Sequence, residues 1–380
     1  MDFDFQWLLI GLPVAFAFGW LASRFDLRQV RRDNRDAPKA YFKGLNLLLN
    51  EQQDKAIDAF IEAVQNDPDT TELHFALGNL FRRRGEFERA VRVHEHLLAR
   101  GDLKSTERDR AQHALAQDFM KAGLFDRAEA AYRALEGTPF AGEARLALLS
   151  LYERSRDWHN ASAVASQLEQ AGSGSFAARI AHYACELAQE ADERGRHDEA
   201  AAALQRAREA APQAARPLVQ AGQRLARAGQ HAQALEAWDE LRLRQPAAFL
   251  LVADAYADSA RAAGRAAQAV AMLRSLFDKL PSLDLLRALG RLDAAPPLLP
   301  LLQQQPSLSA AQLWLAQPAD TRGADGDAGL AAVRDAVGRA AKPLQRYRCA
   351  ACGFEAQHYF WQCPGCLSWD SYPPQRVEEQ

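Results

Sequence analysis

Cysteine is scarce in this chain of 380 residues, which holds only five. Four of them lie within residues 349–366, and the fifth, Cys185, is far away in the sequence. Five cysteines clustered in this way are too few for a disulfide framework. A set of four is typical of a metal site in a protein of a reducing compartment.

A strong charge of either sign is also lacking. The net charge of −3 argues against bulk attraction to nucleic acid, and nucleic acid is not an expected partner. No Ser/His/Asp arrangement, phosphate loop or paired-carboxylate cleft stands out, so we do not expect an enzyme. Hydrophobic residues make up 48% and charged residues 25%, which excludes wholesale disorder. The length predicts two or three folded units.

The one long apolar run lies at the N-terminus, where residues 5–22 carry no charge. As a helix this run spans about 27 Å, close to the thickness of a bilayer core. Arginines follow it at once, which marks the cytoplasmic flank: Arg24, Arg28, Arg31, Arg32 and Arg35. We therefore expect an uncleaved transmembrane anchor over residues 1–23, with its N-terminus outside, and a basic juxtamembrane linker over residues 24–37. The alternative is a buried or interfacial helix.

Small residues recur every fourth position within the anchor, at Gly11, Ala15 and Gly19. Such a face lets another membrane helix approach closely, so it is a candidate packing face for a partner. Glycine and alanine are also common in membrane helices without any such role.

Residues 38–281 repeat with a period near 34. Gly44 and Gly78 are 34 residues apart, and small residues recur in register in every unit: Ala56, Ala90, Ala128, Ala161, Ala200, Ala234 and Ala269. A proline follows several of them by 12 residues: Pro68, Pro212, Pro246 and Pro281. This pattern predicts an all-α tetratricopeptide (TPR) superhelix of about seven repeats, each a pair of antiparallel helices. The repeat decays in residues 282–345, which we interpret as degenerate helical repeats and a connection, with a loop at 319–329 and a further helix near 330–341.

Such a solenoid has a concave groove lined by the first helix of each pair. By register, five polar side chains of the second and third repeats fall at or near it and are candidates for binding an extended or acidic peptide: Asn79, Arg82, Arg83, Gln117 and Lys121. A merely solvated face is the alternative. Cys185 belongs with the repeats, and we expect it to be a buried core side chain.

The clustered cysteines form two C-x-x-C pairs, Cys349 with Cys352 and Cys363 with Cys366. Two such turns supply the four sulfurs that a tetrahedral zinc prefers, and iron in a rubredoxin-like site is the alternative. Gly353 and Gly365 suit tight turns that adopt positive φ, and His358 is expected to be peripheral. Aromatic residues flank both pairs: Tyr347, Phe354, Tyr359, Phe360, Trp361 and Trp369. We predict that residues 346–380 form a small zinc-ribbon knuckle whose metal is structural.

The order of these features resembles the lipopolysaccharide assembly protein B (LapB/YciM) family. The resemblance rests on LPVAFAFGW in the anchor, NLLLNEQQDKAIDAF and LGNLFRRRGE in the first repeats, MKAGLFDRAE, IAHYACELA, and RYRCAACGF with YFWQCPGCLSWDS. It implies a single-pass inner-membrane protein with a periplasmic N-terminus and a cytoplasmic body. It also implies an adaptor that promotes destruction of the deacetylase LpxC by the protease FtsH, and a membrane sensor of lipopolysaccharide as a partner through the transmembrane helix. Residues 282–340 match the family poorly.

Two function classes remain. One is an adaptor that presents a client to a membrane protease, and the other is a general anchored scaffold or co-chaperone that assembles the lipopolysaccharide machinery. The sequence does not determine the oligomeric state, and a homo-oligomer is among the states it allows.

Overall fold

The computed structural model describes residues 16, 20, 42–294, 307–316, 334–335 and 337–380. The predicted anchor, its small face at Gly11, Ala15 and Gly19, and the linker at 24–37 therefore lie outside the described residues, apart from Phe16 and Trp20. Within the described ranges no helix has the length and apolarity needed to cross a membrane. The chain divides into two compact units, which we call unit 1 (Met1–Ser155) and unit 2 (Arg156–Gln380).

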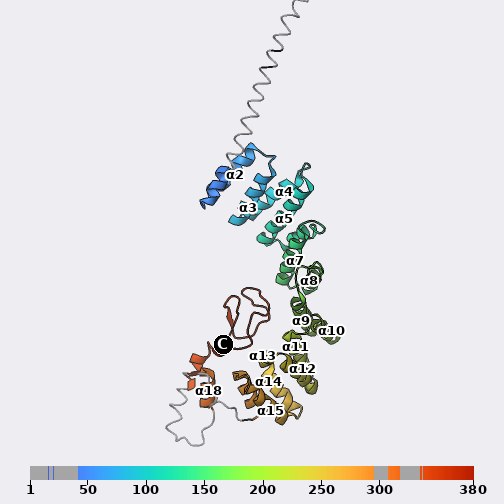
Figure 1. Ribbon diagram of the computed structural model, residues 1–380, viewed down its shortest axis with the longest axis vertical. Helices are drawn as coiled ribbons and strands as arrows, with labels where there is room; N and C mark the ends of the chain where they lie inside the picture. Colours follow the sequence, from blue (N-terminus) through green and yellow to red (C-terminus); the bar gives the residue numbers. More distant parts are fainter. Residues whose placement is uncertain (1–15, 17–19, 21–41, 295–306, 317–333, 336) are drawn as a thin grey trace, which may run out of the picture. The chain divides into compact units, whose positions relative to one another are not determined.

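Unit 1 is a row of helices drawn in blue to green in Figure 1. It consists of a helix at residues 42–49, α2 (Gln53–Asn66), α3 (Thr71–Arg84), α4 (Phe87–Ala99), α5 (Ser105–Ala122), α6 (Phe125–Arg133) and α7 (Ala141–Ser155). α3 packs on α4 and α5 packs on α6. Gly85 and Gly123, with φ of 85° and 76°, end α3 and α5 in the left-handed region and permit a short turn into the next helix.

Unit 2 also consists of helix pairs and ends in the cysteine segment (Figure 1). Its helices are α8 (Trp158–Gln170), α9 (Ala177–Glu193), α10 (His197–Ala210), α11 (Ala215–Arg227), α12 (His231–Arg244), α13 (Pro246–Phe249), η1 (Leu250–Val252), α14 (Ala253–Ala262), α15 (Ala266–Phe277), α16 (Leu283–Arg291), α18 (Leu308–Ala316) and η2 (Val377–Glu379). α9 packs on α10 and α11 on α12.

The repeating small residues lie where helices cross. The side chains of Ala56, Ala90, Ala128, Ala161, Ala200 and Ala234 are fully buried, and Ala269 is nearly so. A glycine in the first helix of a pair meets a large side chain sixteen positions later in three repeats, as Gly44 meets Phe60, Gly78 meets His94 and Gly222 meets Trp238. These contacts confirm the all-helical tetratricopeptide architecture predicted from the period of 34.

The region after the repeats is partly described. α16 and α18 are helical, as are residues 337–341, whereas the predicted loop at 319–329 lies outside the described residues. Cys185 in α9 is fully buried, and burial raises the pKa of its thiol to about 12. The prediction that Cys185 is a core side chain is therefore confirmed.

The cysteine segment, which we call the ribbon (residues 347–373), is held by a short antiparallel sheet. β1 (Tyr347–Arg348) pairs with β2 (Glu355–Ala356), with Tyr347 opposite Ala356. Its core is formed by Tyr347, Cys349, Cys363 and Tyr372, and Leu251 of η1 packs against this core. The η1 turn thus brings a side chain of the repeats into the ribbon.

Candidate functional site

The four clustered cysteines converge on one point. Their sulfur atoms all lie within 4.8 Å of one another. The Cys349 and Cys366 sulfurs are 3.9 Å apart, and those of Cys352 and Cys363 are 3.7 Å apart. A metal with bonds of about 2.3 Å to four sulfurs in a tetrahedron requires separations of about 3.8 Å between them. The donor set therefore fits one tetrathiolate metal, and with four protein ligands the metal would serve as a structural cross-link.

The two cysteine pairs form equivalent turns. The amide of Gly353 donates to the carbonyl of Cys349 at 2.9 Å, and the amide of Leu367 donates to the carbonyl of Cys363 at 2.8 Å. Gly353 has the positive φ that we predicted, 78°. The prediction for Gly365 is wrong, because the left-handed residue of the second turn is Leu367, with φ of 60°. The residue after the second cysteine of a pair, and not one inside the pair, makes this turn.

Hydrogen bonds to sulfur favour the thiolate form of two of the four cysteines. Burial opposes ionisation of Cys349, but the Ser371 hydroxyl and the backbone amides of Cys352 and Ala351 outweigh it and lower the pKa of this thiol to about 6. The hydroxyl and the amide of Ser368 lower the pKa of Cys366. Because thiolates are the form that binds a metal, these donors favour metal binding by Cys349 and Cys366. The hydrogen bond from the Phe354 amide lowers the pKa of Cys352, but its contacts with the other three cysteine sulfurs and burial outweigh that bond and raise the pKa to about 12.

The flanking aromatic residues divide into three groups. Tyr347 and Tyr359 pack in or against the ribbon core, together with Tyr372, which we did not predict. Phe354 and Phe360 are exposed. Trp361 and Trp369 instead meet the helices of unit 2, as described below. His358 is exposed and is not part of the sulfur cluster, as expected for a peripheral residue.

The ribbon docks on α9 through a histidine. His182 Nε2 lies 2.6 Å from Asp370 Oδ2, so the imidazole donates to the carboxylate. The Trp369 ring stacks on the His182 ring with centroids 4.6 Å apart, and it meets Trp158 and Tyr183 edge-on. His182 is almost fully buried. This single histidine therefore positions both a ribbon carboxylate and a ribbon tryptophan.

A buried arginine completes the docking site. Arg216 on α11 is 4% exposed, and its guanidinium lies 5.8 Å from the centre of the Trp361 ring and 6.0 Å from that of Trp369. It also forms an ion pair with Glu186 of α9 at 2.6 Å. A buried guanidinium is stabilised by an anion and by aromatic rings that face it. Since the anion belongs to α9 and the rings belong to the ribbon, the Arg216 charge holds α9, α11 and the ribbon together.

The last residues of the chain fasten the end of the repeats. Glu379 Oε1 accepts a hydrogen bond from the amide of Leu283 at 2.8 Å and so caps α16. Glu378 accepts from the Ser307 hydroxyl, before α18, at 3.2 Å. Arg376 lies 3.2 Å from Asp284. Residues 376–379 thus satisfy helix N-termini that are more than sixty positions away in the sequence.

The candidate groove residues of unit 1 have different environments. Arg82 is half-buried and already forms an ion pair with Asp118 at 2.8 Å, and Asn79 accepts a hydrogen bond from Arg82. Asp118 is fully buried and also faces His94. Arg83 and Lys121 are exposed, and Gln117 is half-buried beside His113. Arg83 and Lys121 thus carry charge on the surface, while Arg82 holds a buried carboxylate.

The sequence reasoning missed the docking residues His182, Arg216 and Asp370. A signal was present, because His182 and Arg216 lie among the small apolar residues that face the core in α9 and α11. A polar residue at a core position predicts a buried partner. The sequence does not say which of the distant residues that partner is.

Two family models agree with this architecture. A family model described as the rubredoxin metal binding domain matches residues 347–373, and a tetratricopeptide repeat model matches residues 41–93 and 113–176. A solved tetratricopeptide repeat protein from Parabacteroides merdae is 16% identical, covering 68% of this chain and 98% of that chain with a TM-score of 0.34.

Two relatives match almost end to end. Lipopolysaccharide assembly protein B of Haemophilus influenzae is 27% identical over 411 residues, which is 98% of each chain. Lipopolysaccharide assembly protein B of Escherichia coli K12 is 31% identical over 383 residues, which is 97% of this chain and 98% of the relative. With this identity over nearly its whole length, the chain belongs to the lipopolysaccharide assembly protein B family.

Proposed function

We propose that this chain is a membrane-anchored cytoplasmic adaptor that regulates lipopolysaccharide synthesis and performs no catalysis itself. Family membership supports a role in the lipopolysaccharide pathway, because the relatives are named for lipopolysaccharide assembly. The observation that carries the adaptor role is the joining of helix pairs to a closed four-sulfur ribbon. Helix repeats supply binding surface, and a metal with four protein ligands has no open position for a substrate.

The client in this proposal is LpxC, which the adaptor holds beside the protease FtsH. Both identities come from the family resemblance. Anchoring supports the arrangement physically, since it confines the repeats to the plane of the membrane. A bound client then meets a membrane protease at a raised effective concentration without any new contact.

The anchor itself is the second part of the proposal. Residues 1–23 cross the inner membrane with the N-terminus in the periplasm, and the basic linker at 24–37 stays in the cytoplasm. The small face at Gly11, Ala15 and Gly19 receives a helix of the membrane sensor of lipopolysaccharide. The metal of the ribbon is zinc, with iron as the alternative.

The experiment measures the half-life of LpxC in cells that carry only one version of the chain. Removing residues 1–22 should leave a folded protein that no longer hastens LpxC breakdown. The substitutions Gly11→Leu and Gly19→Leu should leave insertion intact, because leucine is more apolar, and should weaken regulation by the sensor. The matched control is Leu9→Ile, which keeps an apolar side chain.

Two results would count against the proposal. A half-life that is equally short with the truncated and the full-length chain would refute the need for anchoring. LpxC that is stable with both would refute the protease adaptor and favour the general assembly scaffold, whose loss changes complex formation and not the lifetime of one protein.

A further inference from the structure

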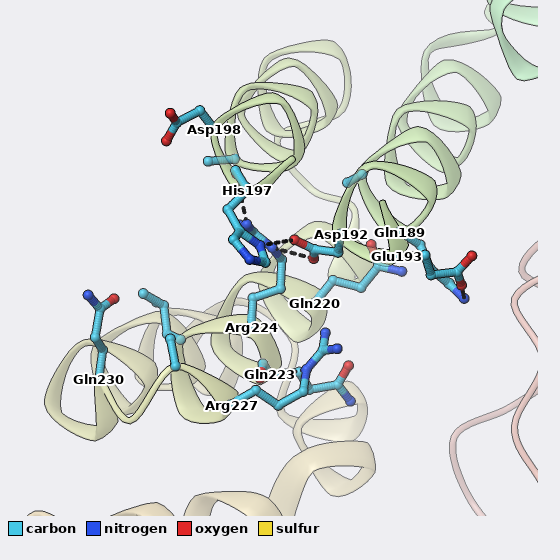
Figure 2. A pocket seen from close by; sticks show the side chains of 14 residues that line it. Gln189, Asp192, Glu193, His197, Asp198, Gln220, Gln223, Arg224, Arg227 and Gln230 are labelled. Carbon is cyan, nitrogen blue, oxygen red and sulfur yellow. Dashed lines mark hydrogen bonds and ion pairs between the residues drawn. The ribbon is translucent and has the colours of Figure 1, made fainter. Parts of the chain in front are cut away.

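A cavity of about 900 Å³ opens between the second halves of α9 and α11 and the start of α10. Figure 2 shows the side chains that line it, with Gln189 and Glu193 from α9 and Gln220, Gln223 and Arg227 from α11. Most of the side chains that line it are polar or charged, with alanines and Leu225 between them. Neither the proposed function nor the metal centre uses this cavity. We call it the α9–α11 cavity.

The centre of the wall is a fixed network of charges. Arg224 donates from Nε to Asp192 Oδ2 at 2.5 Å and from Nη2 to the carbonyl of His197 at 2.9 Å. His197 Nδ1 faces the other Asp192 oxygen at 3.2 Å (Figure 2). The network joins α9, α10 and α11, and within it the Asp192 carboxylate neutralises the charge of Arg224. The network therefore holds the Arg224 guanidinium in place at the centre of the wall.

The remaining groups exclude several classes of ligand. Asp192, Glu193 and Asp198 outnumber the guanidiniums of Arg224 and Arg227, so a phosphate or other anion would meet net negative charge. Among the described residues that line the cavity there is no phenylalanine, tyrosine or tryptophan, so a sugar ring or a nucleobase would lack a large ring to stack on.

The groups in the cavity that remain for hydrogen bonding to a ligand are side-chain amides. Gln220 is half-buried and Gln223 is exposed, and among the described residues neither side-chain amide has a hydrogen-bond partner, so both are available to a ligand at the wall. A glutamine amide donates and accepts at once. The main chain of an extended peptide presents donors and acceptors in the same alternation, and it leaves them unpaired when it is not in a sheet.

The same two helix faces already hold an irregular segment of this chain. His182 and Arg216 contact the ribbon at Trp369, and Gln189 and Gln223 lie seven residues further along their helices. Seven residues are about two turns, so the four side chains form two stripes that run from the ribbon into the cavity. Gln223 also lines a smaller cavity together with ribbon residues. The α9–α11 cavity is thus the uncovered continuation of a face that binds non-helical chain.

We propose that the α9–α11 cavity binds an extended peptide segment of the client through its main chain, with the amides of Gln220 and Gln223 as the principal contacts. This inference rests on the proposed function for the identity of the client. Glu193 and Asp198 at one side favour a segment with a basic side chain there. Recognition is then tolerant of sequence and depends little on salt, because neutral amides make the main contacts.

The test uses the full-length chain in lipid nanodiscs and two probes, purified LpxC and overlapping 15-residue peptides that tile its sequence. Gln220→Ala with Gln223→Ala should weaken binding of both probes about tenfold, since each lost hydrogen bond costs a few-fold in affinity. Gln167→Ala with Gln170→Ala on α8 removes two amides outside the cavity, and it should change the affinity less than twofold. The affinity of the unsubstituted chain should fall less than threefold between 50 and 300 mM salt.

The outcomes separate this inference from the proposed function. If LpxC binds the unsubstituted chain and the Gln220/Gln223 variant equally well, the cavity is not the client site, although the adaptor role stands. The inference would also be overturned if the double variant Arg83→Ala with Lys121→Ala lost binding while the Gln220/Gln223 variant kept it. That result would place the client-binding site on unit 1. If neither LpxC nor any peptide binds the unsubstituted chain, the client assignment and the cavity proposal both fail. Thermal unfolding of each variant verifies that it is folded.

Discussion

Two residues that follow cysteines define the turns of the metal centre. Gly353 and Leu367 occupy equivalent places, and both adopt positive φ, 78° and 60°. Glycine does so freely, whereas a leucine pays a steric penalty because its Cβ approaches the backbone. The two halves of the ribbon are therefore alike in conformation but unequal in strain.

At this scale we predict that Leu367→Gly stabilises the ribbon by about 1 kcal/mol, because the left-handed turn no longer carries a Cβ. Leu367 is exposed, so little packing is lost. The measurement is the concentration of chelator that unfolds the ribbon, followed by tryptophan fluorescence. Gly353→Ala is the matched opposite change and should lower that concentration. Equal effects of the same sign would show that these turns are not strained.

In several helix pairs, a glycine of the first helix packs closely against a large side chain of the second helix. A Cβ built on Gly222 would lie 2.2 Å from the Trp238 indole nitrogen, and one on Gly78 would lie 2.5 Å from the His94 ring. Both large side chains are fully buried and cannot move away. The glycine therefore permits the crossing of the two helices in these repeats, and its low helix propensity is the cost of that crossing.

At the scale of a helix pair, we predict that Gly222→Ala destabilises unit 2 by up to about 2 kcal/mol. The clash with Trp238 costs roughly 1–3 kcal/mol and outweighs the gain in helix propensity of about 1 kcal/mol. Gly290→Ala on α16 is the control, because nothing lies within 4 Å of the added Cβ, and it should be neutral or stabilising. Urea unfolding of the two variants measures both. Destabilisation by Gly290→Ala of the same size would assign the effect to glycine itself.

The ribbon links the metal to the far end of unit 2. The ribbon contacts His182 of α9 and Leu251 of η1. Glu379, which follows the ribbon, caps α16. A ribbon of this size has too little core to fold without its metal. The docking of Trp369 and the cap from Glu379 consequently depend on the same four sulfurs.

At this scale we predict that Cys363→Ser removes the metal and releases the ribbon. Structural zinc contributes roughly 10–16 kcal/mol of apparent binding energy in zinc-finger peptides, so its loss exceeds what the ribbon can recover. Elemental analysis should give one zinc per parent chain and none for the variant, and protease should then cleave within residues 346–380. Cys185→Ala is the control and should keep the metal. One iron per parent chain would change the identity of the metal alone, whereas no metal in the parent chain would refute the site.

The sequence by itself determined the local patterns. The period of 34 identified the buried alanines, and the two C-x-x-C pairs identified the sulfur cluster, because each pattern is set by contacts between residues close in the chain. Only the tertiary structure decided where the ribbon docks. His182 and Asp370 are 188 positions apart in the sequence. The Arg216 guanidinium faces the ribbon tryptophans only once the ribbon has docked on α9 and α11. The tertiary structure likewise decided that Arg82 binds Asp118. No spacing encodes such pairs, since their partners are selected by burial of charge and aromatic surface in the assembled fold.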